Sequence, residues 1–182
     1  MSSEYPLPPE CDEVILSQPM IARRVAELGA SLAEQYAGKD LRLITVLRGG
    51  AFFLADLMRA VDAPLRVDFL AVAAYRPGGG SVRMTKDLDD DITGAHVILV
   101  EDVVDTGLTV NYVLSFLRSH NPASLEVCTL LDKPARRIAQ VPISLTGFEV
   151  SDRFLAGYGL DLHGRYRNLP YIAAVRDEVV FG

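Results

Sequence analysis

The first half of the chain alternates helical and strand patterns of apolar residues. Ser17 stands where a helix cap is favoured, and the segment that follows it runs to Gly38. Its apolar residues recur at helical spacing, at Ile21, Val25, Leu28 and Leu32. Next, Leu41–Leu47 is a short apolar run that predicts a strand, two glycines after Arg48 break it, and residues 51–61 regain the helical pattern. The predicted order is helix, strand, glycine turn, helix.

The same alternation continues along the chain. Strands are predicted at Leu65–Ala73, at His96–Val104 and at residues 125–131, and a helix at residues 110–120. Because these strands are apolar on both faces and alternate with helices, they favour a sheet that is covered on each side. The pattern therefore predicts an α/β fold with a mostly parallel central sheet flanked by helices.

Three segments depart from this alternation. Residues 76–84 contain three consecutive glycines and predict a mobile loop between two strands, and the proline-rich residues 1–10 predict an extended tail. Towards the end of the chain, short β-like runs at residues 143–150 and 171–175 alternate with irregular segments. We expect the tail and residues 142–182 to form a small hood, within a single domain of 182 residues.

Composition narrows the class of function. The net charge is −6, from 18 basic and 24 acidic residues, which lacks the basic footprint of a nucleic-acid-binding protein. An anionic substrate would need locally placed cations, a metal ion or backbone amides. The two cysteines, Cys11 and Cys128, are far apart and predict neither a disulfide framework nor a zinc site, which fits a reducing cytoplasm. The sequence shows no leader pattern and no apolar run of about 18 residues, so we expect a protein that is neither exported nor embedded in a membrane.

Residues 97–109, V-I-L-V-E-D-V-V-D-T-G-L-T, carry the clearest chemical signal. Four apolar residues predict a buried strand, and Glu101 and Asp102 follow where that strand should leave the sheet. Open α/β sheets bind ligands at this edge. The next loop contains Thr106 and Gly107 and leads into a helix, so its free amides and hydroxyls can hold a phosphate.

Simpler interpretations exist for each part of this stretch. An isolated Glu-Asp pair is more often a solvated strand end, and Asp105 alone is more often a helix cap. The triplet D-T-G also occurs in aspartic proteases. Here, however, a helical pattern begins at Thr109 and the chain has no second D-T-G. Thirteen residues in this order therefore favour a phosphate site.

The stretch matches the phosphoribosyl-pyrophosphate motif of type I phosphoribosyltransferases, and it resembles the hypoxanthine-guanine branch in particular. Four more motifs carry the resemblance, which extends from about Leu16 to Val175. They are V-L-R-G-G from Val46, L-L-D-K-P from Leu130, D-R-F-L-A-G-Y-G-L-D from Asp152, and R-Y-R-N from Arg165.

The resemblance implies a purine-salvage enzyme. Such an enzyme uses Mg²⁺ to transfer the phosphoribosyl group of phosphoribosyl pyrophosphate to N9 of hypoxanthine or guanine, giving IMP or GMP and pyrophosphate. It would be a cytoplasmic homodimer or homotetramer. Two alternatives stay open: a xanthine-preferring enzyme, and a nucleotide-sensing regulatory protein that binds RNA or DNA on the same fold. The net acidity and the intact Asp105 count against the second.

The resemblance also assigns roles around the ribose and its phosphate. Asp105 would be the catalytic residue, acting as general base or acid at purine N7. Glu101 and Asp102 would hold the ribose hydroxyls and Mg²⁺, and Asp161 would orient a second Mg²⁺. The 5′-phosphate would be bound by the amides of Asp105, Thr106, Gly107, Leu108 and Thr109.

Base and pyrophosphate contacts follow from the same resemblance. Lys133 would donate to the purine 6-oxo group, Phe154 would stack on the base, and the Leu155 main chain would meet its edge. The pyrophosphate would be met by Arg48, Gly49, Tyr75 and Arg167, beside a cis peptide bond between Leu47 and Arg48. Without the motif, Lys133 reads equally well as a surface ion pair with Asp132, and Phe154 as plain core.

Overall fold

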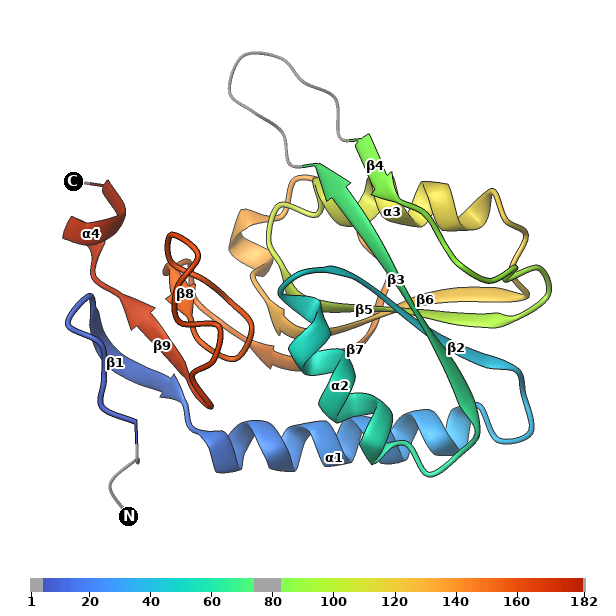
Figure 1. The fold of residues 1–182 in the computed structure, drawn as a ribbon, viewed down its shortest axis with the longest axis horizontal. Helices are drawn as coiled ribbons and strands as arrows, with labels where there is room; N and C mark the ends of the chain where they lie inside the picture. Colours follow the sequence, from blue (N-terminus) through green and yellow to red (C-terminus); the bar gives the residue numbers. More distant parts are fainter. Residues whose placement is uncertain (1–4, 74–82, 182) are drawn as a thin grey trace.

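The computed structural model describes residues 5–73 and 83–181, and its centre is a six-stranded sheet in the order β4-β3-β2-β5-β6-β7 (Figure 1). The strands are β2 (Leu41–Leu47), β3 (Leu65–Ala73), β4 (Arg83–Lys86), β5 (His96–Val104), β6 (Ser124–Asp132) and β7 (Ile143–Glu149). All neighbours in this sheet are parallel except β4, which pairs antiparallel with β3. The predicted α/β fold with a mostly parallel sheet is confirmed.

Helices cover both faces of the sheet. Helices α1 (Gln18–Gln35) and α2 (Gly50–Ala60) pack on one face, and α3 (Leu108–Arg118) packs on the other. Alternation along β5 explains this division, because Ile98 and Val100 join the core under α1 and α2 while Leu99 joins the core under α3. Among the described residues, no helix is long and apolar enough to cross a membrane.

A small antiparallel sheet lies beside the main one and forms the hood (Figure 1). Its strands, in order, are β1 (Cys11–Leu16), β9 (Ile172–Val175) and β8 (Leu155–Ala156), and the short helix α4 (Asp177–Phe181) follows β9. Strand β1 was not predicted. It pairs along its length with β9, a partner about 160 residues away that local pattern does not reveal.

The predicted extent of the hood is wrong at residues 142–150. These residues supply β7, which is the edge strand of the main sheet and runs parallel to β6. Parallel neighbours are usually joined by a crossover helix, but only the 3₁₀ turn η1 (Pro134–Arg136) lies between β6 and β7. Arg24 of α1 holds β7 in place by donating to the carbonyl oxygens of Thr146 (2.7 Å) and Gly147 (3.0 Å).

The predicted loop at residues 76–84 also ends earlier than expected. Arg83 and Met84 belong to β4 and pair with β3, because Arg83 lies opposite Ala73. Residues 74–82, which include Tyr75 and most of the predicted mobile loop, lie outside the described residues. The other predicted elements differ from the observed ones by only a residue or two at their ends.

Candidate active site

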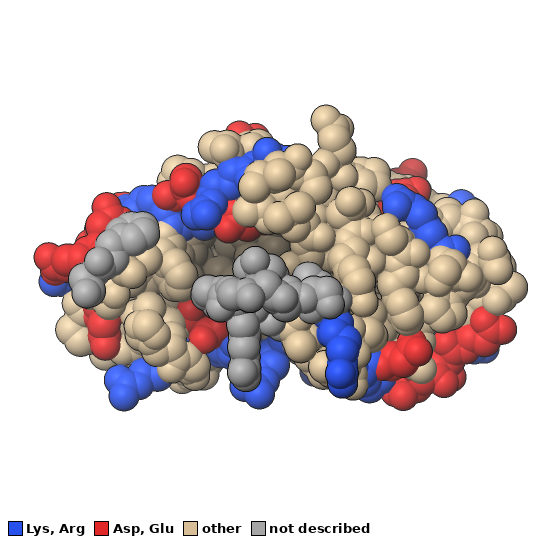
Figure 2. Space-filling model, turned by 90° about the horizontal axis from the view of Figure 1, so that it is seen from above, with Lys and Arg blue, Asp and Glu red and all other residues tan. Residues whose placement is uncertain are grey.

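A cavity of about 430 Å³ opens where β5 and β6 end and the hood begins. Seen from above, the surface is hollowed between the hood and the main sheet, with acidic and basic side chains near the hollow (Figure 2). Seven predicted site residues line the cavity: Asp102, Asp105, Lys133, Phe154, Leu155, Asp161 and Arg167. The other lining residues, which sequence reasoning missed, are Val103, Arg136, Asp152, Leu160, Asp177 and Val180.

The predicted phosphate loop lies between β5 and α3. Gly107 has a left-handed φ of 81° and immediately precedes the helix, and the amide of Leu108 lies 3.4 Å from Thr106 Oγ1. The back of the loop is held by the segment after η1. The amides of Ile138 and Ala139 donate to the Thr106 carbonyl oxygen at 2.9 and 3.0 Å. The loop is thus fixed before any ligand arrives, at a helix N-terminus that favours anions.

Arg137 completes this support. Its guanidinium donates to the carbonyl oxygens of Asp105 (3.1 Å) and Val104 (3.3 Å), and it pairs with the Asp132 carboxylate. Asp132 is therefore engaged by Arg137. The alternative interpretation of Lys133 as a surface ion pair with Asp132 is wrong.

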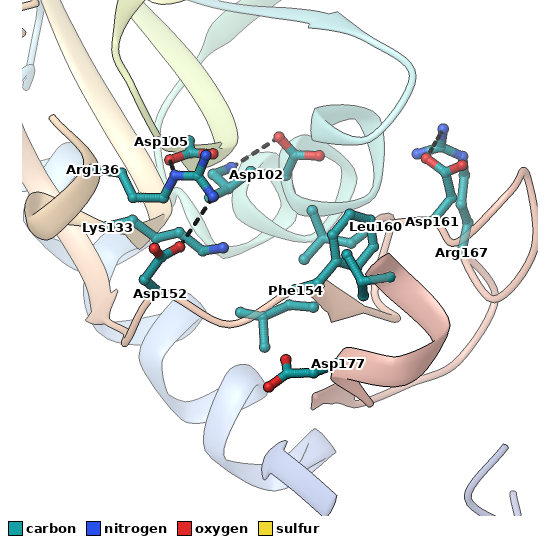
Figure 3. Close-up of a pocket in the computed structure, with 13 residues that line it drawn as sticks. Asp102, Asp105, Lys133, Arg136, Asp152, Phe154, Leu160, Asp161, Arg167 and Asp177 are labelled. Carbon is teal, nitrogen blue, oxygen red and sulfur yellow. Dashed lines mark hydrogen bonds and ion pairs between the residues drawn. The ribbon is translucent and has the colours of Figure 1, made fainter. Parts of the chain in front are cut away.

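Asp105 faces the cavity beside a bridging arginine (Figure 3). Arg136 Nε lies 3.0 Å from Asp105 Oδ1, and Arg136 Nη1 lies 3.1 Å from Asp152 Oδ1. The Nε contact is an ion pair without hydrogen-bond geometry, because Asp105 Oδ1 is buried and accepts no hydrogen bond from the described residues. Since the Asp105 side chain as a whole is 40% exposed, its other oxygen, Oδ2, is the one open to a ligand.

Lys133 reaches the cavity from the end of β6 and is only 8% exposed. Its Nζ donates to the carbonyl oxygen of Arg153 at 2.6 Å. Burial lowers the pKa of Lys133, while the nearby carboxylates of Asp105 and Asp152 oppose that shift. A buried ammonium group with donors to spare is suited to bind a carbonyl oxygen of a ligand.

The hood supplies the apolar side of the cavity. Phe154 is 42% exposed and borders the cavity, so the alternative interpretation of this ring as plain core is wrong. Leu155 beside it is buried, and Leu160 and Val180 extend the apolar lining. An aromatic face over a slot with a few polar groups is suited to a flat heterocycle.

Glu101 and Asp102 lie in the second half of β5, directly after its apolar run. Glu101 is 7% exposed and does not line the cavity. Burial raises the pKa of Glu101 well above its ordinary value, and the neighbouring Asp102 adds to the shift. Burial also raises the pKa of Asp102, although the Val103 amide donates to Asp102 Oδ1 at 2.8 Å. Of the two neighbouring carboxyl groups, Asp102 lines the cavity, where a cation or hydroxyl donors would stabilise its charged form.

The turn between β2 and α2 lies against Asp102. A Cβ on Gly49 would overlap Asp102 Oδ2, so no side chain fits at this position. The peptide bond between Leu47 and Arg48 is cis, as expected from the resemblance. Arg48 is exposed and does not line the cavity.

Asp161 and Arg167 form the remaining charged pair of the cavity wall (Figure 3). Arg167 Nη2 lies 2.5 Å from Asp161 Oδ1, and Arg167 Nη1 donates to the Gly159 carbonyl oxygen at 2.5 Å. The Gly164 amide donates to the second Asp161 oxygen at 2.7 Å. Both oxygens of Asp161 are thus already engaged.

Comparison with known proteins decides the family. The phosphoribosyl transferase domain model matches residues 13–163. The chain belongs to the phosphoribosyltransferase family.

Individual relatives place this phosphoribosyltransferase in the hypoxanthine-guanine group. It is 44% identical over 169 residues to the hypoxanthine phosphoribosyltransferase of Haemophilus influenzae, which covers 90% of this chain and 94% of the relative. It is 44% identical over 181 residues to the hypoxanthine-guanine phosphoribosyltransferase of Mycobacterium avium, covering 94% and 89%. The crystal structure of a hypoxanthine phosphoribosyltransferase from Staphylococcus aureus superimposes with a TM-score of 0.90 at 39% identity, covering 95% of each chain. The recognised family and the enzyme class are confirmed.

Most residues missed by sequence reasoning in this phosphoribosyltransferase lie next to predicted ones. Asp152 begins the motif that contains Phe154, and Arg136 stands three residues after Lys133. The high density of charged residues in these motifs was the signal from which Asp152 and Arg136 could have been found. Asp177 is different, because only the pairing of β9 with β8 brings the start of α4 to the cavity.

Replacing Gly107 by alanine is expected to destabilise the fold. Its left-handed φ is unfavourable for any other residue, and a Cβ there would lie 2.6 Å from the Ala139 carbonyl oxygen. Gly38→Ala is a matched control, because Gly38 has φ 72° with no atom within 4 Å of the added Cβ. Urea denaturation should show a loss of about 1–2 kcal/mol for Gly38→Ala and about 1–3 kcal/mol more for Gly107→Ala. Equal losses would contradict the predicted overlap with Arg137, Ala139 and Val141.

The buried Glu101 predicts a pH-dependent stability. A carboxyl group whose folded pKa is raised favours folding fully below its ordinary value of 4.5, and that contribution is lost as pH rises through the raised pKa. Glu101→Gln removes the charge, so we expect the variant to be at least about 1 kcal/mol more stable than the unmodified protein at pH 8. The difference should vanish at pH 4 in urea denaturation. The exposed Glu34→Gln serves as control, and a gap that persists at pH 4 would contradict the assignment.

Proposed function

We propose that this enzyme transfers the phosphoribosyl group of phosphoribosyl pyrophosphate to N9 of hypoxanthine or guanine, as a step of purine salvage that gives IMP or GMP and pyrophosphate. One observation carries the proposal. A single cavity joins the carboxylate that opens a phosphate loop, a buried lysine and an exposed aromatic face, through Asp105, Lys133 and Phe154. The similarity to the hypoxanthine phosphoribosyltransferase of Haemophilus influenzae and the hypoxanthine-guanine phosphoribosyltransferase of Mycobacterium avium supports the same reaction.

The base would lie between the hood and the end of β6. Lys133 would donate to the 6-oxo group, Phe154 would stack on the ring, and the Leu155 main chain would meet the ring edge. An amino group at position 6 has no acceptor for the lysine, which is how the site would distinguish 6-oxopurines from adenine. Asp105 would take or return the proton at N7 through its exposed carboxylate oxygen.

The sugar phosphates would be held on either side of Asp105. The amides of Asp105 to Thr109 would bind the 5′-phosphate, because the loop is already braced by Arg137 and by the amides of residues 138 and 139. Arg48, Gly49 and Arg167 would meet the pyrophosphate, and the forked guanidinium of Arg167 matches phosphate geometry. The proposed contact of Tyr75 lies outside the described residues.

Magnesium would be brought with the substrate. The donors at the end of β5 are oxygens only, which suits a hard ion, but the described residues gather no three acidic, histidine or cysteine side chains around one point. Magnesium commonly keeps water and substrate phosphates with one or two carboxylates, so Glu101 and Asp102 would hold it together with the cosubstrate. Asp161, whose two oxygens are held by Arg167 and by the Gly164 amide, would orient a second ion. When bound, Mg²⁺ would neutralise charge on the departing pyrophosphate.

Cellular context and assembly complete the proposal. A reducing cytoplasm fits two free, buried cysteines, and burial raises the pKa of Cys128 to about 12. A homodimer or homotetramer is proposed from the family resemblance. Size-exclusion chromatography with light scattering tests it, and a monomer at micromolar concentration would contradict it.

The rival functions can be separated in one set of assays. Pyrophosphate release is measured with phosphoribosyl pyrophosphate, Mg²⁺ and each of hypoxanthine, guanine, xanthine and adenine. We expect release with hypoxanthine and guanine and none with adenine. Release with xanthine alone would identify a xanthine-preferring enzyme. No release with any base, together with retention of RNA or DNA at moderate salt, would favour the regulatory protein.

A further inference from the structure

The hood touches the main sheet through two glycines. Gly159 has φ 97°, and a Cβ there would lie 2.5 Å from the Gly49 carbonyl oxygen and 3.2 Å from the Phe52 side chain. The hood and the turn between β2 and α2 are therefore in backbone contact. Arg167 is tied to this point, since its carbonyl accepts from the Gly159 amide at 2.9 Å and its Nη1 donates back to the Gly159 carbonyl oxygen at 2.5 Å. The position of Gly159 therefore sets the position of Arg167.

The residue before Gly159 anchors this segment to α2. The Tyr158 hydroxyl donates to Asp56 Oδ2 at 2.6 Å, across 102 residues of sequence. Tyr158 has a left-handed φ of 47°, and its amide donates to the Leu169 carbonyl oxygen at 2.9 Å. Burial, and then the Asp56 carboxylate, raise the pKa of Tyr158, so the hydroxyl stays protonated and donates at neutral pH.

Arg167 has open space on two sides, so its orientation depends on its hydrogen bonds and its ion pair. It lines the candidate active site and also a second cavity of about 250 Å³, bordered by Asp56, Phe52 and Tyr158. A side chain between two cavities has few packing neighbours. Its orientation depends on its bonds to Gly159 and Asp161, and these depend on where the hood segment lies.

We infer that Tyr158 and Asp56 are positioning residues for Arg167, because their hydrogen bond fixes the hood segment on α2 and so holds the guanidinium beside the β2–α2 turn. This inference rests on the proposed function, in which Arg167 and that turn bind pyrophosphate. Neither Tyr158 nor Asp56 lines the candidate active site. A merely structural bond would affect stability alone, whereas a positioning bond affects the KM of one substrate and spares that of the other.

Tyr158→Phe is the first test, since it removes the hydroxyl and keeps the ring. Steady-state kinetics should show a rise of about fivefold to tenfold in the KM for phosphoribosyl pyrophosphate, with the KM for hypoxanthine within about twofold. Tyr171→Phe is the matched control. Tyr171 is also a hood tyrosine, and its hydroxyl donates to the Pro6 carbonyl oxygen at 2.9 Å. This control should lower Tm without changing either KM.

Substitutions of Asp56 test the other end of the bond. Asp56→Asn keeps an acceptor and should retain a KM for phosphoribosyl pyrophosphate near that of the unmodified protein, whereas Asp56→Leu should match Tyr158→Phe. Combining Tyr158→Phe with Asp56→Leu should give no further rise, because both remove the same bond. The Asp56 variants also keep the test possible if Tyr158→Phe does not fold. Asp56 additionally pairs with Arg59 at 3.5 Å, and Tyr158→Phe leaves that pair intact.

Failure of the inference differs from failure of the proposed function. An active protein whose KM for phosphoribosyl pyrophosphate is unchanged by Tyr158→Phe and Asp56→Leu would overturn the inference. The inference would also be overturned if the KM for hypoxanthine rose together with the KM for phosphoribosyl pyrophosphate in these variants. An equal rise in the KM for phosphoribosyl pyrophosphate in the control Tyr171→Phe would overturn it as well. If the unmodified protein makes no nucleotide, the proposed function fails instead. The inference can then be tested without turnover, by measuring the Kd for phosphoribosyl pyrophosphate by calorimetric titration. An equal Kd for the unmodified protein and Tyr158→Phe would then overturn the inference.

Discussion

Asp105→Asn is expected to lower kcat by about 10²–10⁴ with little change in the affinity for phosphoribosyl pyrophosphate. The substitution preserves the size of the side chain but removes the group that accepts the N7 proton. The phosphate loop should keep its shape, because its supports from Arg137, Ile138 and Ala139 are bonded to backbone carbonyls and not to the Asp105 side chain. Single-turnover and steady-state rates with hypoxanthine measure the effect.

A control separates the loss of the proton-accepting carboxylate from the loss of its contact with Arg136. Asp152→Asn disturbs the other carboxylate that Arg136 bridges, at 3.1 Å, and leaves Asp105 in place. We expect this variant to lose less than about tenfold in kcat. If Asp105→Asn kept the kcat of the unmodified protein, or if both variants fell equally, Asp105 would not be the proton acceptor.

Lys133→Ala is expected to reduce kcat/KM for hypoxanthine and guanine by an amount equal to about 1.5–3 kcal/mol. The 6-oxo group would enter a partly desolvated pocket and find no charged donor. The truncation also releases the Arg153 carbonyl, which now accepts from Nζ at 2.6 Å. The loss should fall on both bases equally, since both carry the 6-oxo group.

Lys39→Ala is the matched control for this variant. Lys39 also donates from Nζ to a backbone carbonyl, that of Gln35 at 2.9 Å, but it is exposed and follows the end of α1. Its removal should leave kcat/KM unchanged. If Lys133→Ala used both bases as well as Lys39→Ala does, Lys133 would have no part in recognising the base.

Much of the fold could be predicted from the sequence, because most strands and helices are marked by the pattern of their own residues. The strands Leu41–Leu47, Leu65–Ala73 and His96–Val104 have the predicted bounds, since each is an apolar run ended by a turn or a change of pattern. The placement of β7 was wrong because its sheet depends on pairing with β6 and not on its own pattern. β1 was missed for the same reason, as its partner β9 is near the other end of the chain.

The candidate site divides in a similar way. Asp105 and Lys133 stand in compact motifs, and the family resemblance carried by these motifs placed both residues on the same ligand. The bridge by Arg136 between Asp105 and Asp152 could not be predicted, because it depends on side-chain directions across three segments. The ion pair between Asp132 and Arg137 could not be predicted either. Because Asp132 is paired with Arg137, Lys133 is available to the cavity.

Nucleotide synthesis by the purified protein tests the central claim most directly. The protein is incubated with phosphoribosyl pyrophosphate, Mg²⁺ and hypoxanthine, and the products are separated by chromatography and compared with authentic IMP. We predict stoichiometric formation of IMP and pyrophosphate, a matching reaction from guanine to GMP, and no nucleotide from adenine. Failure to form IMP or GMP at saturating substrates, from a protein that is folded by circular dichroism, would contradict the account.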